Sequence, residues 1–135
     1  MSKSDLSEGS RINLTDTEDQ IINKIKKAKT DNNLLPGNIN GFKGRPEVEN
    51  LMGIYSSINN QNINETLSEF EGKNFVDFKK KLSEKIVSIL SPISKEIKKL
   101  LADTEYLDKI LEEGGLKAQE ISQKKVKKIK EIVGF

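Results

Sequence analysis

The sequence contains no cysteine, no histidine and no tryptophan, and only 5% of its 135 residues are aromatic. Without cysteine or histidine the chain can form no disulfide, no metal site of the usual zinc ligands and no Ser-His or Cys-His catalytic pair. The 33% charged and 34% hydrophobic residues favour aliphatic helices over a β-sandwich or barrel. No apolar run approaches the roughly 20 residues that span a bilayer, and the first residues are polar. We therefore expect no metal site, no membrane segment, no secretory signal and a cytoplasmic location.

The basic residues are almost all lysine, with 21 Lys against 2 Arg, and the net charge is +2. Lysine is a flexible point charge that suits phosphate, whereas the planar fork of arginine reads carboxylates and guanine edges. Any contact with nucleic acid is therefore expected to involve phosphates.

The first half of the chain predicts three helices joined by loops. Residues 1–14 predict a loop, and a capping box formed by Thr15 and Glu18 predicts a helix that runs to about residue 29. A high density of Asn, Gly and Pro predicts a long loop over 30–45. Pro46 suits the first turn of a helix that ends near residue 59. A short third helix is predicted to be capped by Asn62 with Glu65 and to stop at Gly72.

The second half predicts three more helices, which makes the chain an all-α helical bundle over 15–135. The longest spans 75–101 and contains Pro92, where we expect a bend without an end. Another begins at Asp103 or Thr104 and ends at Gly114 and Gly115, and the last runs over 117–133. The apolar positions expected to be buried on the last two helices are Tyr106, Leu107, Ile110, Leu111, Ala118, Ile121, Val126, Ile129, Ile132 and Val133.

Several motifs occur in an order and spacing that resemble a known family. Met1-Ser2-Lys3-Ser4-Asp5, Ile12-x-Leu14-x-Asp16 and Lys24-Ile25-x-x-Ala28-x-Thr30-Asp31 resemble the region from the KMSKS signature onward in class I aminoacyl-tRNA synthetases. The resemblance narrows to the tryptophanyl-tRNA synthetases through Arg45-Pro46, Asn50-Leu51-x-x-Ile54-Tyr55 and Glu71-Gly72-Lys73-x-Phe75-x-x-Phe78-Lys79. It covers essentially the whole chain through Ser91-Pro92-Ile93, Leu107-Asp108-x-Ile110-Leu111-x-x-Gly114 and Lys117-Ala118.

The resemblance implies a C-terminal fragment that starts inside KMSKS and lacks the Rossmann catalytic domain. In the family this loop closes over ATP, used with Mg²⁺, during activation of tryptophan, before the tryptophanyl group passes to its tRNA. Lys3 corresponds to the lysine that stabilises the phosphates, and Ser2 and Ser4 correspond to positions that shape the loop. Residues 1–14 then form the KMSKS loop and its connector, and the fragment alone is expected to be inactive and to bind ATP weakly.

Residues 15–135 correspond to the anticodon-binding part of the family, so the expected partners are tryptophan tRNA and the missing catalytic domain. The family is homodimeric, but we expect the fragment to be a monomer. The candidate tRNA-binding residues are Lys73, Lys79, Lys80, Lys124, Lys127 and Lys128. Two alternatives stay open: these lysines are solvated outer faces, or the chain is a freestanding domain that binds a protein. Tyr55, Phe75 and Phe78 lie on apolar stripes, so core packing is favoured over stacking on bases.

Overall fold

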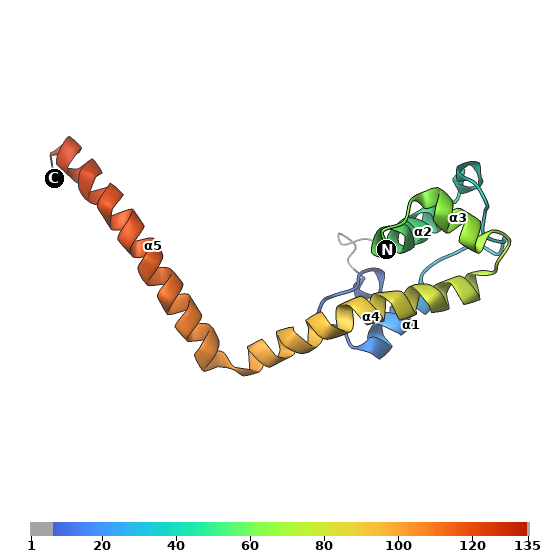
Figure 1. Cartoon of the computed structure of the whole chain (residues 1–135), viewed down its shortest axis with the longest axis horizontal. Helices are drawn as coiled ribbons and strands as arrows, with labels where there is room; N and C mark the ends of the chain where they lie inside the picture. The colour runs from blue at the N-terminus through green and yellow to red at the C-terminus, as the bar shows by residue number, and fades with distance from the viewer. Residues whose placement is uncertain (1–6, 135) are drawn as a thin grey trace. The chain divides into compact units, whose positions relative to one another are not determined.

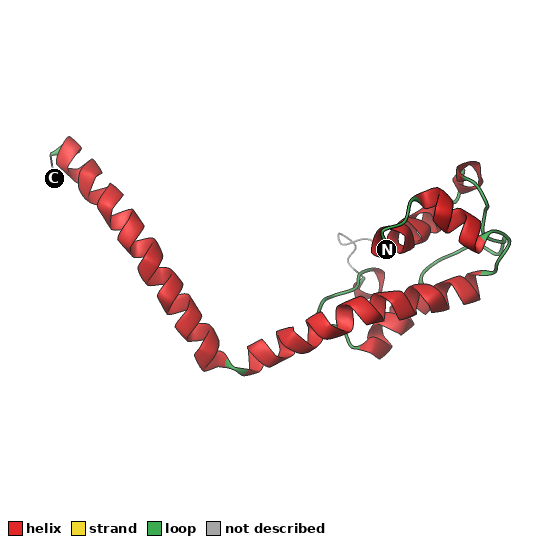
Figure 2. Ribbon diagram, viewed as in Figure 1, coloured by secondary structure: helices red, strands yellow, loops and turns green. Residues whose placement is uncertain are grey.

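The computed structural model describes residues 7–134, and within that range every regular element is helical (Figures 1 and 2). The prediction of an all-α fold is therefore confirmed. The contacts divide the chain into two compact units, residues 1–95 and 96–135, and each is described by itself. The elements are the 3₁₀ helices η1 (Glu8–Ser10) and η2 (Ile39–Phe42) and the α-helices α1 (Glu18–Lys27), α2 (Pro46–Ile58), α3 (Ile63–Phe70), α4 (Phe75–Ala102) and α5 (Thr104–Val133).

The first unit has a core that is centred on three aromatic rings. The ring of Phe70 lies edge-on to both Tyr55 and Phe78, with 4.9 Å between centroids in each pair. These rings, together with Phe75, are buried, which confirms that the aromatic side chains serve packing. Aliphatic side chains of four helices complete the core, among them Ile21, Ile25, Leu51, Met52, Leu67, Leu82 and Ile86.

Most predicted helix boundaries in this unit are confirmed, but the first capping box is wrong. The structure uses Thr17 and Gln20, each side chain bonded to the other residue's backbone N–H, two residues beyond the predicted Thr15 and Glu18. The physical reason is that Asp16 turns back to accept the N–H of Asn13, which holds residues 13–16 in a turn. Pro46 begins α2 and Asn62 caps α3 with Glu65, as predicted.

The long connection from α1 to α2 is an ordered loop. Leu35 is buried and pairs through its backbone with the segment before α4, donating to Lys73 O and accepting from Gly72 N, both at 3.0 Å. Farther along, Phe42 enters the core from η2. The predicted loop over 30–45 therefore contains a short helix and two core side chains, which the density of turn residues did not reveal.

The second unit begins at residue 96 and contains the last turns of α4 and the whole of α5. Asp103 caps α5 by accepting the N–H of Tyr106 at 3.0 Å, and α4 continues through Pro92, as predicted. The predicted stop at Gly114 and Gly115 is wrong, because the helix continues through both to Val133. Two glycines cost a helix about 1 kcal/mol each relative to alanine, which the good helix formers on either side offset.

The predicted burial of the last two helices is also wrong, since α5 has no buried residue. Leu111, Ile121 and Ile132 are 71%, 64% and 75% exposed. These side chains lie with Ile110, Val126, Ile129 and Val133 on one side of the helix, and we call them the α5 apolar stripe. Among residues 7–134 no helix has the length and hydropathy needed to cross a membrane.

Candidate nucleic-acid interface

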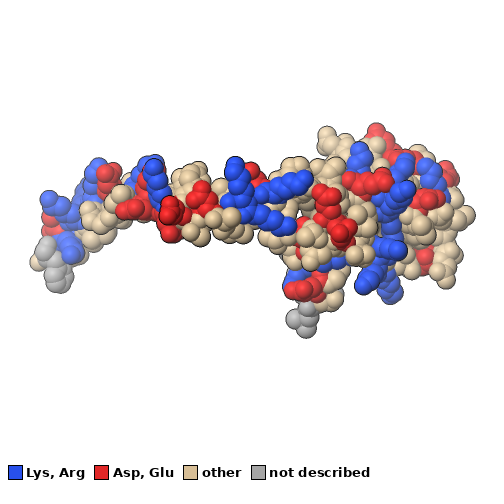
Figure 3. Space-filling view, turned by 90° about the horizontal axis from the view of Figure 1, so that it is seen from below, with Lys and Arg blue, Asp and Glu red and all other residues tan. Residues whose placement is uncertain are grey.

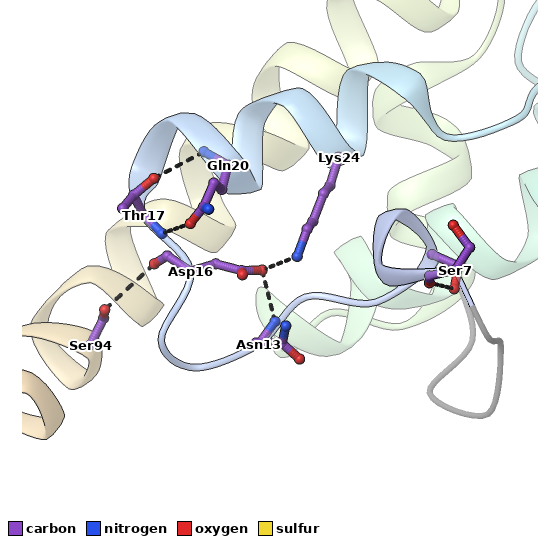
Figure 4. Close-up of polar contacts among 8 residues, drawn as sticks. Ser7, Asn13, Asp16, Thr17, Gln20, Lys24 and Ser94 are labelled. Atoms are coloured by element: carbon purple, nitrogen blue, oxygen red, sulfur yellow. Dashed lines mark hydrogen bonds and ion pairs between the residues drawn. The ribbon is translucent and has the colours of Figure 1, made fainter.

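The residues that match the KMSKS signature, Ser2, Lys3 and Ser4, lie outside the described residues. The first described segment after them is a connector, residues 7–17, that is tied to two helices (Figure 4). Asp16 makes most of the contacts that hold this segment: its carboxylate accepts hydrogen bonds from Asn13 N at 2.9 Å and from Lys24 Nζ on α1 at 2.6 Å. On its other side, Ser94 Oγ of α4 lies 3.5 Å from the backbone oxygen of Asp16. The connector is therefore held to both α1 and α4.

The electrostatics of Asp16 suit a structural role. Burial alone would raise the pKa of this carboxyl, since its side chain is only 7% exposed. The hydrogen bonds from Lys24 and Asn13 outweigh burial and hold the pKa below its usual value. Asp16 is thus an ionised anchor of the turn over residues 13–16.

Of the predicted tRNA-binding lysines, Lys79 is occupied within the fold. Its Nζ donates to the backbone oxygens of Ala28 at 2.7 Å and of Lys26 at 3.3 Å, at the C-terminal end of α1. A cation is favourable there because the last carbonyls of a helix carry partial negative charge. Burial lowers the pKa of the Lys79 ammonium. Lys79 therefore joins α4 to the C-terminal end of α1.

Lys73 and Lys81 lie against the aromatic core instead. Their ammonium groups are 5.2 Å and 5.3 Å from the centroid of Phe70, within the range of a cation–π contact. Lys81 also pairs with Glu69 at 3.2 Å, whereas Lys73 has no ion pair with a described residue. Lys80, which precedes Lys81 on α4, is exposed and likewise has no ion pair within residues 7–134.

The three candidates on α5 form one basic face. At about 100° of rotation per residue, Lys124, Lys127 and Lys128 fall within roughly 100° of one another. All three are exposed, and none forms an ion pair with a described residue. Figure 3 shows basic side chains gathered in groups that alternate with acidic ones. The helix thus presents a lysine face beside the α5 apolar stripe.

The structure also forms a feature that the sequence did not predict, a cavity of about 670 Å³ between η2 and the start of α2. Beside it in the sequence, Arg45 ties the loop together, because the guanidinium donates to both carboxylate oxygens of Asp31 at 2.7 and 2.9 Å and to Leu34 O at 3.1 Å. The Arg45 side chain lowers the pKa of Asp31. The only sequence signal for this cavity was the density of Asn and Gly, which indicates a turn but not a hollow.

Acidic side chains are not gathered into a metal site in the part of the chain that the structure describes, residues 7–134, where no group of three potential ligands occurs.

Comparison with known proteins assigns the chain to a class of enzymes. Residues 1–91 match the family model of class I tRNA synthetases specific for tryptophan and tyrosine (W and Y), and the chain belongs to that family.

Its similar relatives narrow the class further. The chain is 47% identical over all 135 residues to the tryptophan–tRNA ligase of Rhizobium meliloti and 43% identical to that of Caulobacter vibrioides. It is 42% identical to the tryptophan–tRNA ligase of Rickettsia conorii. In each case the whole chain is matched, but it spans only 38% to 40% of the relative's length.

Proposed function

We propose that this chain is the tRNA-recognising, C-terminal part of a tryptophan–tRNA ligase. The observation that carries the proposal is the match of the entire chain, at 42% to 47% identity, to ligases of that name. The complete enzyme would activate tryptophan with ATP and transfer the tryptophanyl group to tryptophan tRNA in the cytoplasm. This chain supplies a share of the tRNA contacts and is inactive alone.

The proposed tRNA contacts are phosphate contacts made by exposed lysines whose ammonium groups form no ion pair with a residue of the described range. Lys73 and Lys80 supply them in the first unit, and Lys124, Lys127 and Lys128 supply them on α5. Lysine neutralises phosphates without reading bases, so these contacts provide affinity and little specificity. Lys79 is excluded from the set because its donors already hold the end of α1.

The proposed partner for the α5 apolar stripe is the rest of the same polypeptide. Exposed aliphatic side chains of this number on one helix face favour burial against another surface. The relatives are more than twice as long as this chain, which leaves ample polypeptide to cover the stripe. A freestanding chain that uses the stripe to bind another protein is the rival. Until its partner is present we expect the chain to be a helical monomer.

The role proposed for the N-terminal residues concerns ATP. An ammonium flanked by two hydroxyls suits a polyphosphate, and Lys3, with Ser2 and Ser4, is assigned to the phosphates of ATP bound with Mg²⁺ in the complete enzyme. ATP supplies the adenylyl group there.

The experiment that tests the proposed function is a salt titration of tRNA binding by residues 1–135. Tryptophan tRNA and an unrelated tRNA are titrated between 50 and 200 mM salt, conditions in which phosphate contacts weaken steeply. We expect salt-dependent binding that is tighter for tryptophan tRNA. Binding that does not change with salt would favour an apolar protein interface, and equal affinity for both RNAs would reduce the surface to a nonspecific polycation.

A further inference from the structure

The side chain of Arg45 joins the two ends of the loop between α1 and α2. Its guanidinium donates to both carboxylate oxygens of Asp31 at 2.7 and 2.9 Å and to Leu34 O at 3.1 Å. Asp31 also accepts the N–H of Asn33 at 2.8 Å. Only 16% of the Arg45 side chain is exposed, and a bidentate pair fixes direction as well as distance. The ion pair therefore holds the backbone of residues 31–34 in place.

The next residue, Leu35, connects this loop to the segment before α4. The N–H of Leu35 donates to Lys73 O, and its carbonyl accepts from Gly72 N, both at 3.0 Å. The Arg45 guanidinium also contacts this segment directly, since it lies 5.9 Å from the centroid of the Phe75 ring, within the range of a cation–π contact. The backbone at Lys73 is therefore tied to Arg45 both through the loop and through Phe75.

The side chain of Lys73 is oriented by Phe70 and can still bind an anion. Lys73 N–H donates to Phe70 O at 3.0 Å, and the ammonium lies 5.2 Å from the centroid of the same residue's ring. Lys73 is exposed and makes no ion pair with a residue of the range 7–134. An ammonium has three donors, which phosphate oxygens accept well. Whether Lys73 contacts a phosphate therefore depends on where its backbone is held.

We propose that Arg45 is a positioning residue for RNA binding, which together with Asp31 holds Lys73 where its ammonium meets a backbone phosphate of the tRNA. The proposal rests on the RNA-binding function proposed above and deepens it. The opposite charges of the Asp31–Arg45 ion pair compensate each other, so Arg45 acts through the position of Lys73. Because lysine is flexible, a fixed backbone beneath it reduces the conformational freedom that phosphate binding removes.

The test removes the Asp31–Arg45 ion pair without changing the net charge of residues 1–135. The variant Asp31→Asn/Arg45→Met loses one charge of each sign. The control Lys29→Met/Glu47→Gln does the same to a 3.0 Å ion pair between the residues after α1 and the first turn of α2. Wild type and both variants are each combined with Lys73→Met. Fluorescence anisotropy gives the affinity for tryptophan tRNA between about 50 and 200 mM salt, and near-ultraviolet circular dichroism checks folding.

The expected result is that the effect of Lys73→Met disappears when the Asp31–Arg45 ion pair is absent. In the wild type and in the control variant, Lys73→Met should reduce the slope of log affinity against log salt by nearly one unit. Asp31→Asn/Arg45→Met should already show the reduced slope, and Lys73→Met should not change it further. An ion pair with only a structural role would lower the urea midpoint but leave the effect of Lys73→Met intact.

Arg45→Lys is a second variant, used if the loss of both charges prevents folding. A lysine keeps the positive charge but has no planar fork, so it cannot bond both Asp31 oxygens and Leu34 O together. The effect of Lys73→Met on the salt slope should then be smaller than in the wild type.

Three results would overturn the proposal, and they differ in what else they affect. If Lys73→Met has the same effect with and without the Asp31–Arg45 ion pair, Arg45 does not position Lys73, and the proposed function stands. If tryptophan tRNA binds but Lys73→Met leaves the wild-type slope unchanged, this inference fails alone. If tryptophan tRNA does not bind the wild type, the proposed function fails together with this inference.

Discussion

Lys79 and Lys80 are adjacent on α4, but the structure gives them different tasks, and exchanging each for methionine separates these tasks. Lys79→Met keeps the aliphatic stem and removes the ammonium that donates at 2.7 and 3.3 Å to two carbonyls at the end of α1. Both charge-assisted hydrogen bonds, of which the one at 3.3 Å is weak, are lost together with the helix-terminus interaction, and the burial of the ammonium reduces their net contribution to stability. We expect the free energy of unfolding of the first unit to fall by about 1–2 kcal/mol.

The assay is urea denaturation followed by near-ultraviolet circular dichroism, which reports the packing of Tyr55 with Phe70 and Phe78. The midpoint for Lys79→Met should fall by about 0.5–1 M at a typical urea dependence. Lys80→Met should leave the midpoint unchanged and should instead reduce the slope of tRNA affinity against salt by nearly one unit. If Lys79→Met leaves the midpoint unchanged and lowers the salt slope, the lysine binds RNA and our assignment is refuted.

Three further substitutions test other parts of the structure. Asp16→Asn should lower the free energy of unfolding by about 1–3 kcal/mol at neutral pH, because Lys24 loses its buried partner. Since folding lowers the pKa of Asp16 from 3.8, the wild type should lose this extra stability as acid protonates the carboxyl, which urea denaturation between pH 7 and pH 2 measures. Leu82→Ala should cost about 2–5 kcal/mol in thermal unfolding, whereas Ile121→Ala, at an exposed position, should stay within about 0.5 kcal/mol of the wild type. A chimera that carries a relative's catalytic domain and a complete KMSKS motif tests Lys3. Lys3→Ala should raise the activation free energy of pyrophosphate exchange by about 2–4 kcal/mol, seen as a lower kcat with a smaller change in KM for ATP. The control Lys109→Ala should change neither constant, and equal effects of the two substitutions would contradict the role of Lys3.

Local signals in the sequence predicted much of the helical structure, because they depend on residues a few positions apart. Pro46 at the start of α2, and Asn62 with Glu65 at the start of α3, satisfy backbone groups within one turn. The first capping box failed because a nearby competitor, the Asp16 turn, moved the helix start by two residues. The predicted helix end at Gly114 and Gly115 was wrong because glycine alone destabilises a helix only modestly, and the residues on both sides of the pair favour helix.

The candidate interface was harder to predict, because it depends on contacts between distant residues. Lys79 and Lys80 are indistinguishable in sequence, and only the approach of α1, about fifty positions earlier, occupies one of them. The same holds for the cavity, where an ordered loop brings Ile39 and Lys43 beside Glu49 on α2. The apolar spacing of α5 correctly marked one face, but periodicity cannot tell whether the covering surface lies within this chain.

The central claim is that this chain is the tRNA-recognising part of a tryptophan–tRNA ligase, and one measurement tests it most directly. The corresponding 38% of the Rhizobium meliloti ligase is replaced by residues 1–135, and charging of tryptophan tRNA is measured for the chimera. We predict that the chimera charges this tRNA, and that substituting Lys124, Lys127 and Lys128 together by alanine raises KM for the tRNA far more than KM for tryptophan. A chimera that folds and activates tryptophan, but charges its tRNA no better than the relative's catalytic domain alone, would contradict the claim.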